Sequence, residues 1–452
     1  MGLRDILLFV LVFGALPFIL WRPHIGVLVW SWLSYMNPHR LTYGLAYSFS
    51  FAQLVAVTLF FSLLFSKEKK RFPVNSTTVL WLLFLLWMGV TTVFAIHQFG
   101  AWVQYEKVVK IQIIALLTVV LMRDRERLHQ LIWVIVLSIG FFSTKGGFFT
   151  LSTGGAYRVY GPAGSFIGEN NSLALATLMV LPLMVYLLKA HRDSPWLRAL
   201  LLAMITLSTV SVVGSQSRGA FLAIGAVGCF FWLKSSRKLL SAALLVLAGL
   251  LLLGFMPDSW HERMASISDY RQDASAMGRI NSWQYAINLA SDRLTGGGFE
   301  SWSPSTFAVW APDPASVHAA HSIFFGVLGD HGWPGLLMFV AILGLTWRTL
   351  RRTEKATRAS SEDFRLHELS KAMQICMIAY CSGGAFLSLA YFDLPWHIVG
   401  IAVIVQRLLE DKQPAEGAAV PHRSMGARMG LRRQDARPQR AATGRSDAEW
   451  HR

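Results

Sequence analysis

The sequence predicts an all-α polytopic membrane protein with about 12 transmembrane helices and one long, partly helical loop on the outer side of the bilayer. Three observations lead to this prediction. The chain is 54% hydrophobic and only 15% charged, whereas soluble proteins average about 25% charged residues. Apolar runs of about 18 residues or more recur along the chain, and each is long enough to cross a bilayer core. The Lys and Arg residues gather in short loops between those runs.

The apolar runs define the expected helices. The stretch 24–36 is short, so it is either a span or a re-entrant or interfacial piece, and the total is about 12 or 13. The side of the membrane on which the N-terminus lies therefore stays open. The first run has no small-x-small cleavage site and is expected to be a retained helix. The candidate spans are 3–20, 24–36, 47–66, 77–95, 105–122, 128–144, 171–188, 197–214, 218–233, 239–256, 321–347, 371–389 and 395–409.

The distribution of positive charge predicts the topology. A net charge of +16 on a soluble chain would suggest nucleic-acid binding. Here five short loops hold 20 Lys and Arg residues, and the opposing loops hold seven. The positive-inside rule explains this bias without nucleic acid and places the five loops in the cytoplasm. They begin at Lys67, Arg123, Lys189, Lys234 and Arg348, and the seven opposing residues are Arg40, Lys145, Arg158, Arg263, Arg271, Arg279 and Arg293.

Three regions are expected along the chain. Residues 1–144 form N-terminal transmembrane helices, and residues 145–410 form a transmembrane core that includes the outer loop 257–320. Residues 411–452 are rich in Arg, Pro, Gly and Ala without periodicity. This composition predicts a disordered basic cytoplasmic tail that is attracted to anionic membrane lipid.

The long outer loop is where we expect a functional site, because long loops concentrate functional residues. It carries seven acidic residues and four arginines, so the positive-inside rule does not account for these arginines. Its first part and residues 275–292 have an amphipathic helical pattern, which a Gly296–Gly298 turn is expected to end. The apolar residues expected on one face of the second helix are Ile280, Trp283, Ile287 and Leu294.

Three side chains on the outer side can carry chemistry. Arg218, at the outer end of its span, can bind a phosphate with two hydrogen bonds or can snorkel to the interface. Arg279, on the loop helix, can bind an anion or be a solvated surface residue. His321 stands where the loop meets the next span. An imidazole titrates near neutral pH, so this residue can act as a general base or can cap the helix.

The remaining polar residues allow simpler readings as well. His318 lies three residues before His321, but no nearby Cys, Asp or Glu completes a metal site, so no metal is expected. No nucleotide-binding or dinucleotide-binding fingerprint is present, and no cofactor is expected. Asn170 or Asn171 can cap the following helix. Lys110 can pair with Glu106 at i, i+4. Three cysteines in apolar segments, Cys229, Cys376 and Cys381, indicate neither a disulfide framework nor a zinc site.

These outer residues together resemble the O-antigen ligase and polymerase superfamily over roughly residues 145–410. Their order, spacing and shared side of the membrane carry the resemblance. The motifs are Ser217-Arg218-Gly219, Gly278-Arg279-Ile280-Asn281-Ser282-Trp283, Gly296-Gly297-Gly298-Phe299, Ala320-His321-Ser322 and Gly329-Asp330-His331-Gly332-Trp333-Pro334-Gly335.

Residues 157–171 resemble a narrower subgroup, the putative O-glycosylation ligases associated with exosortase systems. The segments that carry this likeness are Tyr157-Arg158-Val159-Tyr160-Gly161-Pro162 and Gly164-Ser165-Phe166-Ile167-Gly168-Glu169-Asn170-Asn171. The subgroup usually has an Asp where Glu169 stands, which is a departure from its pattern. The acceptor of this subgroup is unsettled, so the likeness leaves the acceptor open.

The resemblance implies a glycosyltransferase of the bacterial inner membrane with its active site facing the periplasm. Such an enzyme transfers a glycan en bloc from undecaprenyl diphosphate to a hydroxyl, most often on lipid A-core oligosaccharide, with inversion and without a metal. Arg218 and Arg279 match the arginines that hold the diphosphate, and His321 matches the base on the acceptor hydroxyl. Arg158, Lys110, His318 and Glu169 are further candidates for substrate binding.

Three alternatives remain at this point. A protein O-glycosylation ligase or a glycan polymerase of the same superfamily would use the same donor chemistry with another acceptor. A lipid-linked glycan transporter or flippase is of a different class. A transporter should show broken helices and ionisable groups at mid-membrane, whereas the polar candidates here gather at one face.

Overall fold

The computed structural model describes residues 2–235, 237–258, 260–261 and 274–412. Every regular element within these residues is a helix, which confirms the predicted all-α class. The helix predicted in the first part of the long loop, before residue 274, falls mostly on residues 262–273, outside the described residues. The disordered tail predicted from residue 411 likewise lies almost wholly outside them.

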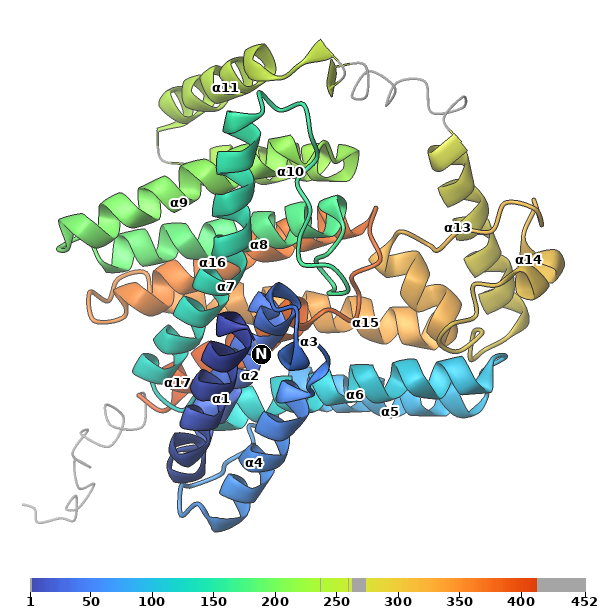
Figure 1. Cartoon of the computed structure of the whole chain (residues 1–452), viewed down its shortest axis with the longest axis horizontal. Coiled ribbons are helices and arrows are strands. Elements are labelled where there is room, and N and C mark those ends of the chain that lie inside the picture. The colour runs from blue at the N-terminus through green and yellow to red at the C-terminus, as the bar shows by residue number, and fades with distance from the viewer. Residues whose placement is uncertain (1, 236, 259, 262–273, 413–452) are drawn as a thin grey trace, which may run out of the picture. The chain divides into compact units, whose positions relative to one another are not determined.

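Each predicted span coincides with a described helix (Figure 1). The elements are α1 (Leu3–Trp21), α2 (Pro23–Met36), η1 (Pro38–Leu41), α3 (Leu45–Ser48), α4 (Phe51–Phe65), α5 (Ser76–Val93), α6 (Gln98–Leu121), α7 (Arg125–Ser152), α8 (Asn170–Ala190), α9 (Pro195–Gly214), α10 (Arg218–Lys234), α11 (Lys238–Phe255), α13 (Ala274–Asp292), α14 (Pro304–Trp310), α15 (Ile323–Ala356), α16 (Phe364–Gly384) and α17 (Asp393–Glu410).

Seven of the described helices are long and apolar enough to cross a membrane, namely α1, α5, α7, α8, α9, α11 and α15. The helices α4 and α10 are apolar but shorter. These lengths and compositions support a multi-pass membrane protein. The count of about 12 spans remains a prediction, because the other helices are short or carry several charges.

The basic loops meet at one end of the helices. Glu68 accepts hydrogen bonds from Arg127 at 2.8 and 2.9 Å and pairs with Arg123 at 3.1 Å. Farther along the chain, Asp363 pairs with Arg125, and Glu368 pairs with Lys189 at 2.6 Å. Four of the five loops that the charge bias groups together are therefore neighbours in space.

Hydrogen bonds also join segments that carry or flank several of the candidate residues. His97 and Ser303 share a hydrogen bond at 2.9 Å, so the start of α6 lies beside the segment before α14 (Figure 1). The backbone N–H of Ile96 donates to the carbonyl of Gly297 at 2.8 Å. The side chain of Asn170, at the start of α8, donates to the carbonyl of Ser215 at 2.8 Å.

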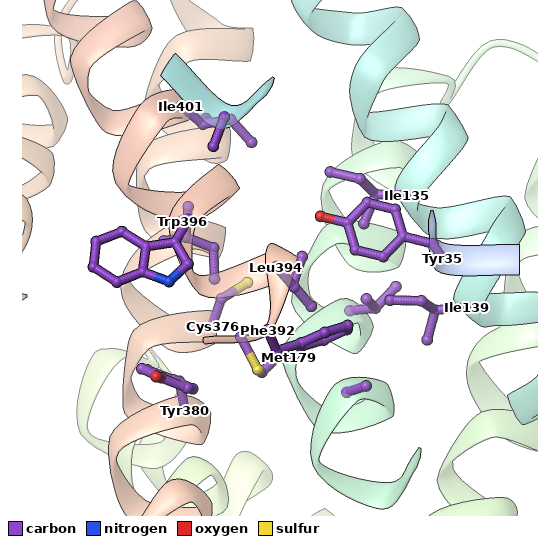
Figure 2. Packing of buried hydrophobic residues seen from close by; sticks show 14 of the residues in the cluster. Tyr35, Ile135, Ile139, Met179, Cys376, Tyr380, Phe392, Leu394, Trp396 and Ile401 are labelled. Atoms are coloured by element: carbon purple, nitrogen blue, oxygen red, sulfur yellow. The ribbon is translucent and has the colours of Figure 1, made fainter. Parts of the chain in front are cut away.

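The hydrophobic core extends through most of the helices, and Figure 2 shows part of it, where residues of α2, α7, α8, α16 and α17 pack together. Aliphatic side chains of α7 face Met179 of α8 and the aromatic rings of the neighbouring helices. Trp396 of α17 stacks on Trp81 of α5 with ring centroids 5.4 Å apart. Aromatic pairs of this kind add about 0.5–1.5 kcal/mol beyond the area that they bury.

The helix α15 is broken at Gly332, which has φ +65° and ψ −173°. The break and Pro334 leave carbonyls of the preceding turn without helical partners. The Gly296–Gly298 turn satisfies two of them, because Gly297 donates to Gly329 at 2.8 Å and Gly298 donates to Asp330 at 2.9 Å. The indole of Trp87 donates to the carbonyl of His331 at 2.9 Å. The two glycine motifs of the sequence therefore form one backbone joint.

Two local predictions are wrong. The buried side of α13 is formed by Asn281, Ser282, Tyr285 and Leu289, whereas Ile280 and Leu294 of the predicted apolar face are exposed. Polar groups occupy the buried side because they bond to the loop that follows. Neither asparagine caps α8, whose N-cap is Glu169 without a side-chain hydrogen bond.

Candidate functional site

Residues 311–322, here called the strap, connect α14 to α15 and carry His318 and His321. Asn281 of α13 makes three hydrogen bonds to the strap, each 2.9 Å long, to the backbone of Asp313 and Ser316. Ser282 donates to the carbonyl of His318 at 2.9 Å. These contacts explain why polar residues occupy the buried side of α13.

An aromatic contact fixes the end of the strap. The indole N–H of Trp283 donates to the carbonyl of Ala320 at 2.8 Å, one residue before His321. The same ring stacks on Phe325 of α15, with centroids 4.9 Å apart and an interplanar angle of 13°. Consecutive residues 281–283 therefore hold the strap along its length, and α13 and α15 together determine where His321 lies.

His321 has an unusual backbone conformation. Its φ is +42°, in the left-handed region that non-glycine residues seldom adopt. The next residue, Ser322, caps α15, and its hydroxyl accepts from the N–H groups of Phe324 and Phe325 at 3.3 and 3.4 Å. Strain of this type costs about 1–3 kcal/mol and concentrates at functional sites. The predicted capping role therefore belongs to Ser322, and the imidazole is left for other contacts.

Charged groups from three segments act on His321. Desolvation by the surrounding protein is the main cause that lowers its pKa below the ordinary 6.5, although the side chain keeps an exposed part. The positive charge of Arg279 lowers the pKa further, His318 adds to this effect, and Glu169 opposes it. The ring is therefore neutral at neutral pH, and its lone pair can accept a proton. The geometry brings Arg279, His318 and Glu169 within electrostatic reach of His321.

His318 packs on the backbone of α13. A Cβ at Gly278 would lie 3.0 Å from His318 Nδ1, so the glycine allows the imidazole to approach. The same nitrogen contacts the hydroxyl of Ser316 at 3.3 Å. Gly278 thus leaves room for the imidazole of His318, and the neighbouring Arg279 lowers the pKa of His321.

Arg218 is the first residue of α10 and is half-buried. Ser217 caps this helix by accepting from the N–H of Ala220 at 3.1 Å. The preceding residue, Gln216, has φ +53° and donates its side-chain amide to the carbonyl of Gly155 at 3.1 Å. The turn before Arg218 is therefore anchored to the segment that leads to Glu169.

The link from Arg218 to the strap is indirect. A Cβ at Gly219 would lie 3.3 Å from Cβ of Phe386, and the ring of Phe386 lies 6.3 Å from that of Trp283. Arg218 is not among the charges that shift the pKa of His321. The structure therefore groups Arg279 directly with His321 and joins Arg218 to them through Phe386.

A pocket of about 380 Å³ lies beside the strap. His318, Ala319, Ala320 and Ser322 contribute to its wall. At its base, the carboxylate of Asp330 accepts from the indole N–H of Trp302 and from the hydroxyl of Tyr391, both at 2.9 Å. A second carboxylate, Glu300, lines the pocket with a left-handed φ of +57°. The pocket thus combines hydrogen-bonding groups with aromatic walls, as small-molecule binding sites do.

Two further candidates lie elsewhere. Lys110 lies inside α6, not at a helix end, and forms an exposed ion pair with Glu106 as expected. It lines an apolar groove of about 700 Å³ with residues of α2, α4 and α6. Arg158 lines another pocket, beside Lys145. Neither residue is among the charges that act on His321.

Some residues of the site had no predicted role. Asp330 is the clearest case, and an acidic residue within an apolar run is a signal that could have drawn attention to it. Lys107 has its Nζ 4.2 Å from the ring centroid of Phe166, which lines the pocket beside the strap. Trp302 and Tyr391 gave no signal, because their function depends on contact with Asp330.

No group of three or more His, Cys, Asp or Glu side chains with metal-ligand geometry occurs among the described residues. The arrangement itself suits acid–base chemistry with an anion. A neutral imidazole can take a proton from a hydroxyl, and a neighbouring guanidinium can bind phosphate oxygens.

Comparison with known families divides the chain into two matched parts. Residues 3–192 match a family of unknown function (DUF5935), and residues 199–340 match the O-Antigen ligase family (Wzy_C). The second match encloses Arg218, Arg279, His318 and His321. No curated protein matches the chain.

Proposed function

The chain is a member of the O-antigen ligase-like superfamily through residues 199–340, and we propose that it transfers a glycan en bloc from undecaprenyl diphosphate to a hydroxyl acceptor. Glycosyl transfer at a membrane is the general activity that the family suggests. The observation that supports the proposal most strongly is that Arg279 lowers the pKa of His321. The strap residues on either side of His321, Ala320 and Ser322, line the pocket, although His321 itself does not.

The proposed reaction is a single displacement. The acceptor hydroxyl oxygen bonds to the anomeric carbon of the donor as the bond from that carbon to the diphosphate oxygen breaks. His321 takes the proton of the hydroxyl, and the electron pair of the broken bond leaves with the diphosphate. One displacement inverts the configuration at the anomeric carbon. Proton removal of this kind contributes about 10²–10⁴-fold to the rate.

Two arginines are proposed to stabilise the leaving group. The charge of Arg279 lowers the pKa of His321. Arg218 is the first residue of α10, where the helix N-terminus adds positive potential. Their charges would neutralise the departing diphosphate without a divalent ion. His318 and Glu169 are proposed to contact the sugar or the acceptor, because both affect the pKa of His321. His318 lines the pocket beside the strap, and Glu169 lies at the start of α8.

The proposed location is the inner membrane with the site facing the periplasm. The clustering of the basic loops at one end of the helices supports this orientation through the positive-inside rule. A lipid-linked donor would reach the site from within the bilayer. The proposed acceptor is lipid A-core oligosaccharide.

The test uses purified protein with a lipid-linked glycan and candidate acceptors. We expect transfer by the wild type and loss of transfer in His321→Ala, Arg279→Ala and Arg218→Ala, with unchanged amounts of protein in the membrane. Full transfer by any one of these variants would remove that residue from the mechanism. Absence of transfer by the wild type to any hydroxyl acceptor, with lipid-linked glycan supplied, would contradict the proposed function.

Two alternatives keep specific support. A protein O-glycosylation ligase is favoured by the likeness of residues 157–171 to the exosortase-associated subgroup, and a polymerase differs only in its acceptor. Deleting the protein and comparing lipopolysaccharide with glycoprotein on gels distinguishes these acceptors. A flippase is favoured by the broken helix α15 and its Asp330. Movement of labelled donor across vesicles without transfer would identify that activity.

A further inference from the structure

A second outer pocket, of about 390 Å³, has three basic residues in its wall. Arg40 comes from η1, Lys145 from the last turns of α7, and Arg158 from the segment after α7. No carboxylate of the described chain pairs with any of the three. Three cations without a paired carboxylate around one cavity give it a positive potential that attracts an anion.

Arg40 is held in place for such an anion. Its guanidinium lies over the ring of Tyr47, 4.9 Å from the centroid. A Cβ at Gly164, where φ is +73°, would lie 3.3 Å from Arg40 Cζ, so the chain passes closely over the guanidinium. Arg40 Nε is buried and has no hydrogen-bond partner in the described structure. A buried donor without an acceptor costs about 1–3 kcal/mol, and a bound anion would supply the acceptor.

The surroundings of the pocket indicate that the anion is carried by a lipid. Lys145 belongs to α7, which is long and apolar enough to span a membrane. Aromatic side chains near the three cations are exposed: Phe149 and Tyr160 line the pocket, and Tyr47 lies against Arg40. Exposed Tyr and Phe next to basic residues are typical of the membrane–water interface, where phosphate headgroups lie.

The pocket is separate from the strap. Its lining residues all fall between 40 and 163, within the part that matches the family of unknown function, and outside residues 199–340. The segment 157–168 lies between the two pockets, because Tyr160 lines this one and Phe166 lines the other. A hydrogen bond from the N–H of Gly161 to the carbonyl of Gly168 closes that segment on itself.

We infer that Arg40, Lys145 and Arg158 form a binding site for a phosphate group carried on a membrane lipid. The guanidinium of Arg40 binds the phosphate from the protein side, and the exposed Lys145 and Arg158 bind it from the membrane side. The apolar rim contacts the acyl or prenyl chain. This function belongs to the N-terminal part of the chain and requires no glycan transfer.

The test measures binding of short-chain lipids to the purified full-length protein in detergent. The probes are dioctanoyl phosphatidylglycerol, farnesyl diphosphate, dioctanoylglycerol and inorganic phosphate. In the variant Arg40→Gln/Lys145→Gln/Arg158→Gln we expect at least tenfold weaker binding of a phosphate-bearing lipid and unchanged binding of dioctanoylglycerol. A loss for phosphatidylglycerol identifies a glycerophospholipid, and a loss for farnesyl diphosphate identifies a polyprenyl donor or product.

Three controls make the result decisive. Lys145→Gln/Arg158→Gln changes only exposed residues, so it folds even if the triple variant does not, and it should weaken binding at least threefold. The variant Arg40→Lys/Lys145→Arg/Arg158→Lys should retain binding, as should Arg358→Gln, which alters an exposed arginine remote from the pocket. Unchanged lipid binding in both neutral variants, or a loss restricted to inorganic phosphate, would overturn the inference. Under the proposed function the strap also binds farnesyl diphosphate, and that binding should persist in all these variants. The result with phosphatidylglycerol is therefore the one that is independent of the proposed transfer reaction.

Discussion

Replacing Asn281 with Ala is expected to loosen the strap that carries His321. The side chain is 8% exposed and makes three hydrogen bonds of 2.9 Å to the strap backbone. A hydrogen bond of this kind contributes about 1 kcal/mol net, so the change removes about 3 kcal/mol. Because about 1.4 kcal/mol corresponds to a factor of ten, local opening of the strap should become about 100-fold more frequent.

Hydrogen exchange followed by mass spectrometry measures this opening directly. We expect amides of residues 315–320 to exchange about 100-fold faster in Asn281→Ala and glycan transfer to slow at least tenfold. Asn288→Ala is the matched control, because Asn288 lies on the same helix but donates to the carbonyl of Trp310 at 2.8 Å, before the strap. Strap exchange within twofold of wild type in Asn281→Ala would refute the reasoning.

Three further predictions concern pH, the helix break and metal. Because burial and Arg279 lower the pKa of His321 below 6.5, kcat/KM should fall with decreasing pH as the ring is protonated, with an inflection below pH 6.5. An inflection above 6.5 would contradict this. Gly332→Ala would place a Cβ 2.1 Å from the carbonyl oxygen of Leu294. The substitution should therefore lower the free energy of unfolding by about 3 kcal/mol or more and lower the thermal unfolding midpoint. Gly344→Ala, with open space at its Cβ, should unfold at or above the wild-type temperature, and equal midpoints for both variants would refute the explanation. Transfer should persist in excess chelator, and a loss reversed by a divalent ion would show that a metal takes part.

The positions of the helices could be predicted because long apolar runs have few alternatives. A run such as 171–188 must hide its backbone polar groups in a helix, and α8 follows it closely. The face of α13 could not be predicted in the same way. Its buried residues Asn281 and Ser282 are polar and become favourable only when the strap carbonyls, more than 30 positions later in the chain, accept their hydrogen bonds.

Candidate residues could be named from the sequence, but their arrangement in space could not. The motifs indicated Arg279 and His321, and the structure adds the effect of Arg279 on the pKa of His321, the left-handed backbone of His321 and the pocket beside the strap. The joint between residues 296–298 and the break at Gly332 lies outside what periodicity can predict, because it depends on backbone hydrogen bonds between distant segments. Asp330 likewise gains its partners only from Trp302 and Tyr391.

The central claim is that His321 accepts the proton of the attacking hydroxyl beside Arg279. The most direct measurement is the initial rate of glycan transfer and of diphosphate-lipid release by purified protein with saturating donor and acceptor. In His321→Ala both rates should fall together by about 100-fold or more. The control His261→Ala removes another exposed histidine, which is not part of the strap, and it should keep the wild-type rate. Transfer by His321→Ala within twofold of the wild type would contradict the claim.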